Sequence, residues 1–385
     1  MKKTISILGS TGSIGLSVFN IINKKKNYFN IYLLAANKNF SLICSQIIKY
    51  KPKIFIISNQ NVYKKVKEKF KKNKIKILNN FDEKINKKLD ITITAIPGIA
   101  GLKPTITMIK ISKKMLIANK ESIICGWSLL KREAFKNKTQ IIPIDSEHFS
   151  IFKLLENHSL KEVKKIYITA SGGPFLHYKY YQLKKIKPKD ALRHPKWKMG
   201  KKISVDSSTL MNKIFELAEA QKLFNLPENK LDILIHPESL VHAIIQFKNG
   251  LTKFIYHETS MIIPLANAIF DTGLDIDKFY NSNKNQNKII KDLKFEKVNS
   301  KIFVLINLKD KINEFPSSSI IINASNEILV DQFLRKKIPF LAISKTIMNI
   351  LSDRNYKKYA IRKPKNIKEI IEIDDWARKN AKKSI

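Results

Sequence analysis

Apolar and polar positions alternate along the first part of the chain in two rhythms. Short apolar runs, typical of buried strands, alternate with longer stretches in which apolar residues recur every three or four positions, as on one face of a helix. The runs predict strands over 4–8, 31–36, 53–57, 75–78, 91–95, 115–118 and 140–144. The longer stretches predict helices over 13–24, 41–50, 61–72, 101–111 and 127–137. This alternation is typical of βαβ units and a mostly parallel sheet.

The pattern changes after about residue 150. In the next part the expected elements are helices over 149–156 and 208–224 and strands over 164–169, 231–236 and 242–247. The last part is helix-dominated, with helices predicted over 324–336, 340–352 and 374–383. We therefore predict an α/β protein with domains over 1–149 and 150–276, a linker rich in Asn, Lys and Ser over 277–300, and a C-terminal helical domain over 301–385.

Composition narrows the protein class. The 385 residues, 44% of them hydrophobic, suffice for one large packed domain or for two to three ordinary ones. Cys44 and Cys125 are the only cysteines, which argues against a disulfide framework or a cysteine-based zinc site and suits a reducing compartment. The chain starts without the apolar core of a signal peptide, and no apolar run approaches the roughly 18 residues that span a bilayer. We expect a soluble cytoplasmic protein that does not bind membranes.

The net charge of +40, from 72 Lys+Arg against 32 Asp+Glu, favours a nucleic-acid or anionic-membrane partner at first sight. The excess is nearly all lysine, however, and it is spread along the chain rather than gathered in one stripe. Lysine, asparagine and isoleucine share A/T-rich codons, so nucleotide bias in the genome is the explanation we prefer. We therefore expect no specific nucleic-acid partner, although the charge should attract anionic small molecules.

A glycine-rich turn, Gly9-Ser10-Thr11-Gly12-Ser13-Ile14-Gly15, joins the first predicted strand to the first predicted helix. Glycines let the backbone approach a pyrophosphate, and the free amides of a helix N-terminus favour an anion. The spacing is G-x-x-G-x-x-G rather than G-x-G-x-x-G, and a purely structural turn is the alternative. The second predicted strand ends with Lys38 where an NAD site usually carries an acid, so the sequence favours NADP.

Asp145 and Glu147 follow the strand predicted over 140–144. Positions i and i+2 share one face of an extended strand end, and two hard oxygen ligands suit a cation such as Mg²⁺ or Mn²⁺. A solvated loop or a helix N-cap is the alternative. The helix predicted over 208–224 offers a third carboxylate, Glu216.

Asn212, Lys213 and Glu216 are spaced i, i+3 and i, i+4, so they should project from one helix face. A lysine, an amide and a carboxylate there could bind a phosphate beside a metal, although an ordinary Lys–Glu surface pair is the alternative. Ser207 or Ser208 is expected to cap this helix.

Three further segments offer ligand-binding chemistry. Residues 171–174, Ser-Gly-Gly-Pro, follow a predicted strand and suit phosphate oxygens, although a plain turn is the alternative. Residues 194–200, His-Pro-Lys-Trp-Lys-Met-Gly, are typical of a mobile lid whose Trp and Met cover a ligand, or of a long loop packed in the core. Residues 118–122, Ala-Asn-Lys-Glu-Ser, follow the sixth strand, where open α/β sheets place their ligands, although an ordinary helix start is the alternative.

The order of these segments is informative in itself. The chain carries GSTGSIG (9–15), ANKES (118–122), DSEH (145–148), SGGPF (171–175), HPKWKMGKKISVDSSTLMNK (194–213), Glu216, HPESLVH (236–242) and NASNE (323–327). In this order the motifs resemble those of the 1-deoxy-D-xylulose 5-phosphate reductoisomerases, and the resemblance covers nearly the whole chain.

The resemblance implies a homodimeric enzyme that uses NADPH and Mg²⁺, Mn²⁺ or Co²⁺. It would convert 1-deoxy-D-xylulose 5-phosphate to 2-C-methyl-D-erythritol 4-phosphate in the non-mevalonate route to isoprenoid precursors. The first domain would then be a Rossmann-like NADPH domain. The second would be the catalytic domain with the lid.

Site residues follow from the same resemblance. The metal ligands would be Asp145, Glu147 and Glu216. The catalytic residues would be Lys120, Glu147, His194 and Lys213. Substrate contacts would come from Lys120, Ser146, Glu147, Ser171, His194, Trp197, Ser207, Asn212, Lys213 and Glu216. Cofactor contacts would come from Thr11, Gly12, Ser13, Ile14, Asn37, Lys38, Asn39, Asn119, Glu121, Met199 and Gly200.

The chain departs from the family pattern at three places. Asn37 and Ile214 stand where glycines are expected, and the second change should be harmless or slightly stabilising inside a helix. Residues 257–264, His-Glu-Thr-Ser-Met-Ile-Ile-Pro, stand where the family has a Pro-Asp-Met-Arg-x-Pro pattern near the nicotinamide pocket. This third change could reduce activity or cofactor affinity.

Two other functions compete with the reductoisomerase. A nucleic-acid-binding protein on a Rossmann scaffold would use the charge of +40, but the sequence has no base-reading motif or array of stacking aromatics. An NADP-dependent dehydrogenase without the rearrangement would use the glycine turn, but it leaves the DSEH and lid motifs unexplained.

Overall fold

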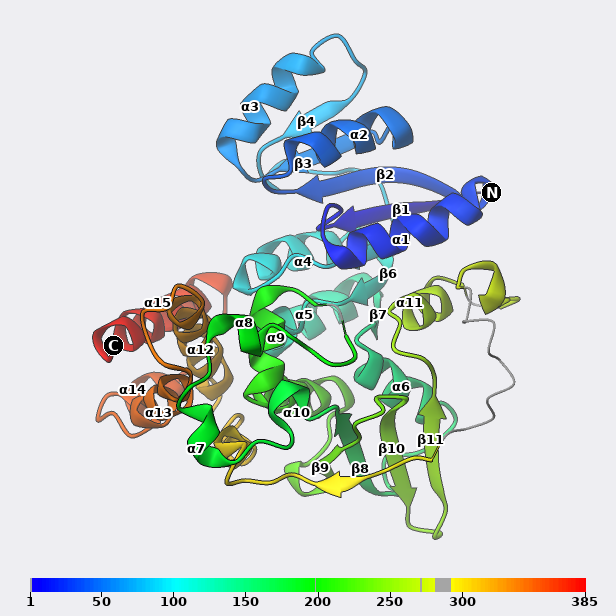
Figure 1. Cartoon of the computed structure of the whole chain (residues 1–385). Helices are drawn as coiled ribbons and strands as arrows, with labels where there is room; N and C mark the ends of the chain where they lie inside the picture. The colour runs from blue at the N-terminus through cyan, green and yellow to red at the C-terminus, as the bar shows by residue number, and fades with distance from the viewer. Residues whose placement is uncertain (1, 198, 271, 281–291) are drawn as a thin grey trace. The chain divides into compact units, whose positions relative to one another are not determined.

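The structure, a computed structural model, describes the whole chain except residues 1, 198, 271 and 281–291 (Figure 1). Lys198 of the predicted lid and residues 281–291 of the predicted linker therefore lie outside the described residues. The chain divides into two compact units. The first contains Met1–Ser122, Ser128–Phe149 and Ser260–Ile289; the second contains Ile123–Trp127, Ser150–Thr259 and Ile290–Ile385.

The first unit is built on a seven-stranded, wholly parallel sheet with the strand order β4-β3-β2-β1-β5-β6-β7. Its strands are β1 (Lys3–Leu8), β2 (Phe29–Ala36), β3 (Ile54–Ile57), β4 (Lys76–Leu78), β5 (Leu89–Thr94), β6 (Ser112–Ile117) and β7 (Gln140–Pro143). Its helices are α1 (Ser13–Lys24), α2 (Phe40–Tyr50), α3 (Gln60–Lys69), α4 (Leu102–Ile109), most of α5 (Lys120–Asn137), the start of α6 (Ser146–Leu154), α11 (Ile262–Ile269) and the short η1 (Lys26–Tyr28), η2 (Ile99–Gly101) and η5 (Ile276–Lys278). The predicted alternation and parallel sheet are confirmed.

The register of this sheet aligns the ends of the central strands. Leu8 pairs with Thr94, Thr94 with Ile117 and Ile117 with Pro143. Because the strands are parallel, the glycine turn, the ANKES segment and the DSEH segment all leave the sheet at the same edge. This edge is where open α/β sheets bind ligands.

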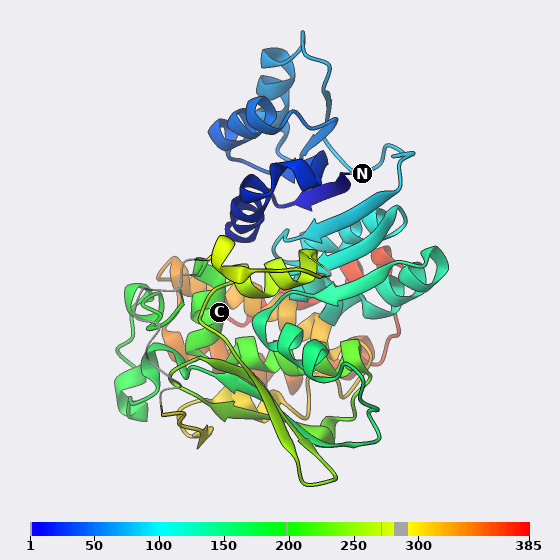
Figure 2. The ribbon, with the colours of Figure 1, turned by 90° about the vertical axis from the view of Figure 1, so that its right-hand side faces the viewer.

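The second unit contains a five-stranded mixed sheet, β11-β10-β8-β9-β12. Its strands are β8 (Val163–Ala170), β9 (Leu231–Ile235), β10 (Val241–Phe247), β11 (Thr252–Tyr256) and β12 (Glu296–Lys297). The helices that precede or pack on this sheet are η3 (Gly173–Phe175), α7 (Tyr180–Leu183), α8 (Pro188–Ala191), α9 (Lys201–Ser208), α10 (Met211–Phe224), η4 (Glu228–Lys230) and η6 (Val304–Leu308). The antiparallel β10–β11 hairpin at one edge is clearest in Figure 2.

The C-terminal part of the second unit is a group of packed helices, as predicted (Figure 1). It consists of α12 (Ser318–Leu334), α13 (Phe340–Leu351), α14 (Tyr356–Ala360) and α15 (Ile367–Lys383). Helix α12 contacts α13, α15 and also α9, so it is buried along most of its length. Within the described part of the chain, no helix combines the length and apolar character needed to cross a bilayer.

Several predicted boundaries were wrong. The helix predicted over 208–224 is two helices, α9 and α10, because Leu210 between them adopts a left-handed conformation with φ 66°. Ser207 and Ser208 therefore end α9 and do not cap α10. Helix α5 begins at Lys120 rather than at 127 because Asn119 caps it. Strand β11 and helix α11 were not predicted at all.

Candidate functional site

The glycine turn of the first unit is shaped by its backbone. Gly9, at φ +85°, lies so close to β5 that a Cβ atom would meet the oxygen of Ala95 at 2.6 Å. A Cβ on Gly15 would meet the oxygen of Gly9 at 2.5 Å, whereas Gly12 faces solvent. The tight turn needs the two outer glycines, and the middle one leaves room for a ligand to approach.

Helix α1 begins at this turn without a side-chain cap on its N-cap residue, Gly12, and without an acid in its first turn. Thr11, Gly12, Ser13 and Ile14 are all solvent-accessible. The first amides of such a helix have no intrahelical partner, so they can bind an anion. Ser10 is committed elsewhere, since its hydroxyl donates to Gln46 Oε1 at 2.7 Å.

The residues that follow β2 are among those predicted to contact the cofactor. Asn37, Lys38 and Asn39 are exposed, and Asn39 also caps α2 by accepting the backbone N–H of Leu42 at 3.1 Å. The strand hydrogen-bonds to the glycine turn, since the N–H groups of Gly9 and Ser10 both donate to Ala35 O at 2.9 Å. Lys38 thus places a charged side chain at the end of β2.

Asn119 and Glu121 follow β6 but are held by structural contacts. Asn119 accepts the backbone N–H of Ser122 at 2.8 Å, which caps α5, and its amide donates to Gly98 O at 3.1 Å and to Glu121 Oε2 at 3.0 Å. Both side chains are buried. Their contribution to a cofactor site would therefore come from how they shape the loop after β6.

Asp145 does not end a strand face as predicted; it precedes helix α6, whose first turn contains Ser146 and Glu147. The backbone N–H of Glu147 donates to Asp145 Oδ1 at 3.3 Å, so the helix-N-cap alternative describes this local geometry. Ser146 donates to Glu147 Oε2 at 2.6 Å. The two carboxylates come from the cap and first turn of one helix, where negative charge is favoured.

Asp145 has two polar neighbours, the ammonium group of Lys120 and the imidazole of His148. Lys120 Nζ lies 3.3 Å from Asp145 Oδ2, and His148 Nδ1 lies 3.3 Å from Asp145 Oδ1. Burial favours the protonated acid, but the Lys120 charge and the His148 hydrogen bond outweigh it and hold the pKa of Asp145 well below its ordinary value. The carboxylate is therefore ionised and able to bind a cation.

In the second unit, His194 links the lid segment to Ser171. The backbone N–H groups of Lys196 and Trp197 donate to His194 Nδ1 at 3.2 and 2.8 Å. The other ring nitrogen, Nε2, lies 2.9 Å from Ser171 Oγ, which also accepts the N–H of Gly173 at 3.1 Å. Burial, reinforced by the nearby Lys213 charge, lowers the pKa of His194 to about 4. The ring is neutral near pH 7.

The start of α10 carries Asn212, Lys213 and Glu216 on one face, as predicted. Lys213 Nζ donates to Glu216 Oε2 at 2.6 Å, and the amide of Asn212 donates to Glu216 Oε1. Glu216 is 1% exposed and Lys213 is 7% exposed, so the surface-pair alternative is excluded. Ser207, half-buried at the end of α9, lies against the Gly173 loop, where a Cβ on the glycine would be 3.1 Å from Ser207 O.

The described part of the lid contains Trp197, Met199 and Gly200. Trp197 and Met199 are half-buried, and Gly200 is the N-cap residue of α9. The indole of Trp197 packs edge-on against His242, with 6.1 Å between ring centroids. The indole of Trp197 therefore packs against a strand of the sheet of the second unit.

Asp206 is an important residue that sequence reasoning passed over. It is 1% exposed, accepts a hydrogen bond from Asn326 at 2.7 Å and pairs with Lys202 at 3.0 Å. It therefore ties α9 to α12 and supports the position of Ser207. Its place inside the motif of residues 194–213 was the available signal, but the partner 120 residues away could not be read from the sequence.

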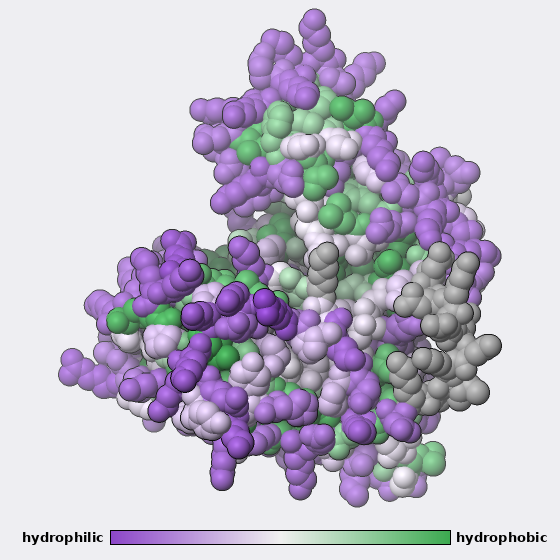
Figure 3. All heavy atoms as spheres, viewed as in Figure 1, coloured by the Kyte–Doolittle hydropathy of each residue, from purple (hydrophilic) through white to green (hydrophobic). Residues whose placement is uncertain are grey.

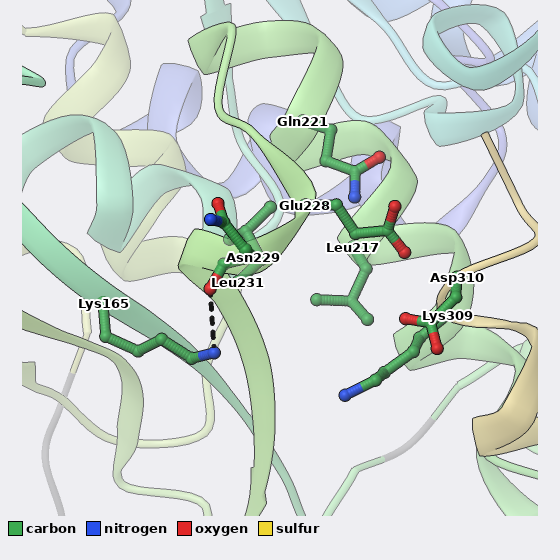
Figure 4. Close-up of a pocket in the computed structure, with 8 residues that line it drawn as sticks. All are labelled: Lys165, Leu217, Gln221, Glu228, Asn229, Leu231, Lys309 and Asp310. Carbon is green, nitrogen blue, oxygen red and sulfur yellow. Dashed lines mark hydrogen bonds between the residues drawn. The ribbon is translucent and has the colours of Figure 1, made fainter. Parts of the chain in front are cut away.

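A pocket of about 360 Å³ in the second unit contains none of the predicted site residues (Figure 4). Lys165 on its wall donates to Asn229 O at 3.0 Å. Burial and a hydrogen bond to Asp310 raise the pKa of Glu228. The pocket is thus separate from the residues that carry the candidate chemistry.

Comparison with known proteins places the chain in a family. Family models for 1-deoxy-D-xylulose 5-phosphate reductoisomerase match residues 5–126, and models for the C-terminal domains of that enzyme match residues 141–224 and 258–380. The 1-deoxy-D-xylulose 5-phosphate reductoisomerase of Pelagibacter ubique is 44% identical over 382 residues, which cover 98% of this chain and 97% of the relative. The chain belongs to the 1-deoxy-D-xylulose 5-phosphate reductoisomerase family.

Solved reductoisomerases share the fold. One, in complex with NADPH, fosmidomycin and magnesium, aligns with a TM-score of 0.90 at 29% identity, over 99% of this chain and 98% of that one. The enzyme of Zymomonas mobilis in complex with NADPH aligns with a TM-score of 0.86 at 30% identity, over 99% and 98%. The resemblance inferred from the motifs and the predicted fold class are confirmed.

Proposed function

We propose that this reductoisomerase-family chain uses NADPH and a divalent metal ion to isomerise and reduce 1-deoxy-D-xylulose 5-phosphate to 2-C-methyl-D-erythritol 4-phosphate. The observation that carries the proposal is the family match over nearly the whole chain. The residues expected for metal and phosphate binding are all present in the sequence, and those for dinucleotide binding are present except at Asn37 and in residues 257–264.

The chemistry of the donors supports a divalent metal. Asp145, Glu147 and Glu216 each offer a carboxylate oxygen as a ligand, and hard oxygen ligands suit Mg²⁺ and Mn²⁺. The lowered pKa of Asp145 keeps this ligand ionised. Lys120, next to Asp145, supplies a positive charge that a cation can replace.

The glycine turn supports a dinucleotide. Any side chain at Gly9 or Gly15 would collide with backbone. The turn is therefore tight, and it allows a ligand to approach the backbone closely. The uncapped start of α1 and exposed Lys38 offer N–H groups and a positive charge to phosphate groups.

In the reaction we propose, the bound metal supplies Lewis-acid polarisation of the substrate and NADPH supplies the reducing equivalent. Ser171, Ser207, Asn212 and Lys213 bind the substrate phosphate, which anchors the molecule away from the reacting carbons. Lys120, Ser146 and His194 orient the polyol. Trp197 and Met199 exclude water when the segment that carries them covers the substrate.

The test is to follow NADPH absorbance with purified protein, 1-deoxy-D-xylulose 5-phosphate and Mn²⁺. We expect oxidation that requires both substrate and metal. Glu216→Gln should lower kcat by at least about a hundredfold, which is the scale seen when an electrostatic stabiliser is removed, and should leave NADPH affinity largely unchanged. Glu372→Gln, on an exposed face of α15, is the matched control. Full turnover by Glu216→Gln would remove the metal assignment.

We propose further that the enzyme is a homodimer. Among the residues that the structure describes, strand β11 pairs only with β10 and forms an edge of the second sheet, and Leu251, Phe254 and Tyr256 at this edge are 57%, 45% and 37% exposed. Such an edge is normally covered. Light scattering should give twice the chain mass, and Phe254→Lys should shift the mass towards the monomer; a monomeric wild type would reject the proposal.

Cytoplasmic localisation belongs to the same proposal. Both cysteines, Cys44 and Cys125, are buried and form no disulfide, as is usual in a reducing compartment.

A further inference from the structure

Three aromatic side chains of the second unit form a continuous stack beneath the lid. His242 on β10 and His257 directly after β11 lie with ring centroids 4.0 Å apart and planes inclined by 21°. Trp197 then packs edge-on against His242 at 6.1 Å and 67°. The two imidazoles are 2% and 8% exposed, so the lid indole meets a buried, two-layered platform.

The hydrogen bonds hold both imidazoles in fixed orientations. The backbone N–H of His257 donates to Leu240 O at 2.9 Å, which continues the β10–β11 pairing. His257 Nδ1 lies 2.8 Å from Glu258 O, and His242 Nε2 lies 3.4 Å from His257 O. Because a carbonyl only accepts, Nδ1 of His257 and Nε2 of His242 carry the protons.

These contacts suit a stack of neutral rings. Burial lowers the pKa of His257, and two charged imidazoles at 4.0 Å would repel each other. Nε2 of His257 is buried and has no hydrogen-bond partner among the described residues. The side chain therefore contributes mainly through its ring face.

We propose that His257 is a positioning residue for the lid: its ring supports His242, which in turn holds Trp197. The inference rests on the proposed function, since it assumes that Trp197 covers the substrate. No other described residue forms a ring contact with His257.

The first test does not depend on activity. The protein contains three tryptophans, and 5-fluorotryptophan labelling gives each a ¹⁹F resonance, that of Trp197 being assigned with Trp197→Phe. We expect His257→Ala to move the Trp197 resonance towards its position in unfolded protein. The resonances of Trp127 and Trp376 should stay in place, and they report whether the fold is intact.

Two comparison variants sharpen this test. His257→Phe keeps a ring face and should leave the Trp197 resonance where it is in the wild type. His158→Ala removes an imidazole that packs on Phe247, with 4.5 Å between ring centroids, and should also leave it in place. The proposal is overturned if the Trp197 resonance stays in place in His257→Ala. It is also overturned if His257→Phe moves this resonance as far as His257→Ala does.

The second test is kinetic. An aromatic contact of this kind stabilises by an amount that corresponds to about two- to tenfold in affinity. We expect His257→Ala to raise KM for the sugar phosphate by about that factor with kcat nearly unchanged, and His257→Phe to restore KM. In a Trp197→Ala background the His257→Ala change should have no further effect, because both act through one contact.

The outcomes separate this proposal from the proposed function. If the effects of His257→Ala and Trp197→Ala on KM multiply in the double variant, His257 acts independently of the lid and the inference is overturned. An inactive wild type would reject the proposed function, while the ¹⁹F result would still decide whether His257 holds Trp197.

Discussion

Hydrogen-bond direction at single residues determines what His194 can do. Two backbone N–H groups of the lid point at Nδ1, so Nδ1 accepts and Nε2 must carry the proton that lies against Ser171 Oγ. Ser171 Oγ then accepts from His194 and from Gly173, which leaves its own proton available to a further acceptor. The sequence identified both residues through motifs, but they are 23 positions apart and the sequence could not show that they touch.

Amide variants of His194 should separate the contacts of its two ring nitrogens. Asn can reproduce the Nδ1 acceptor and Gln the Nε2 donor, so His194→Asn loses the one bond to Ser171, whereas His194→Gln loses the two bonds from the lid N–H groups. Each bond is worth about 1 kcal/mol or roughly fivefold in KM. Trp197 fluorescence should change only in His194→Gln, because that variant loses the bonds to the lid. Equal fluorescence changes in both variants would contradict this division.

The lowered pKa of His194 predicts how kcat/KM depends on pH. Because burial and Lys213 lower the pKa of His194 to about 4, the ring stays neutral as the pH falls through 6.5, the ordinary value. Protonation near pH 4 would turn Nδ1 into a donor facing two N–H groups and break the link to the lid. We expect the pH profile of kcat/KM for wild type and His194→Asn to have the same shape between pH 5 and 8. A change in kcat/KM near pH 6.5 that is present in the wild type and absent from His194→Asn would contradict the account.

At the scale of elements, the sequence was informative where a local rule decides the structure. The strand–turn–helix from β1 to α1 was predicted because glycines and apolar periodicity act within a few residues. The break between α9 and α10 was missed because Leu210 is left-handed without being glycine, and its buried side chain, 1% exposed, stabilises that conformation through packing. Strand β11 was missed because four of its five residues are exposed, so it lacks the alternation of a half-buried strand.

The glycine turn gives a matched pair of substitutions. Gly15→Ala places a Cβ 2.5 Å from Gly9 O and should lower the free energy of unfolding by about 1–3 kcal/mol, as overpacking does. Gly12→Ala places its Cβ no closer than 3.3 Å to Gly9 O, so it should alter stability little but weaken NADPH binding. Urea unfolding and NADPH titration measure the two effects. Equal loss of stability in both variants would contradict this reading of the turn.

At the scale of the whole molecule, charge is the dominant surface property. The net charge is +40, and hydrophilic side chains are spread widely over the face in Figure 3 rather than gathered in one stripe. A diffuse positive field attracts any small anion and reads no base sequence. The sequence predicted this property fully because it is a sum over residues, whereas the placement of site residues depends on the fold.

Salt should therefore affect the capture of substrate. We expect kcat/KM for the doubly charged sugar phosphate to fall as ionic strength rises from about 0.01 to 0.15 M, where the screening length shrinks from about 30 to 8 Å. kcat should change much less, because the bound phosphate is screened little. An unchanged kcat/KM would show that the charge has no part in substrate capture.

The central claim is that this chain rearranges a carbon skeleton before reducing it. The most direct measurement is ¹³C NMR of the product formed from ¹³C-labelled 1-deoxy-D-xylulose 5-phosphate with NADPH and Mn²⁺. The account predicts a methyl group on a branching carbon, as in 2-C-methyl-D-erythritol 4-phosphate. An unbranched, simply reduced sugar phosphate would show a dehydrogenase without the rearrangement and would contradict the account.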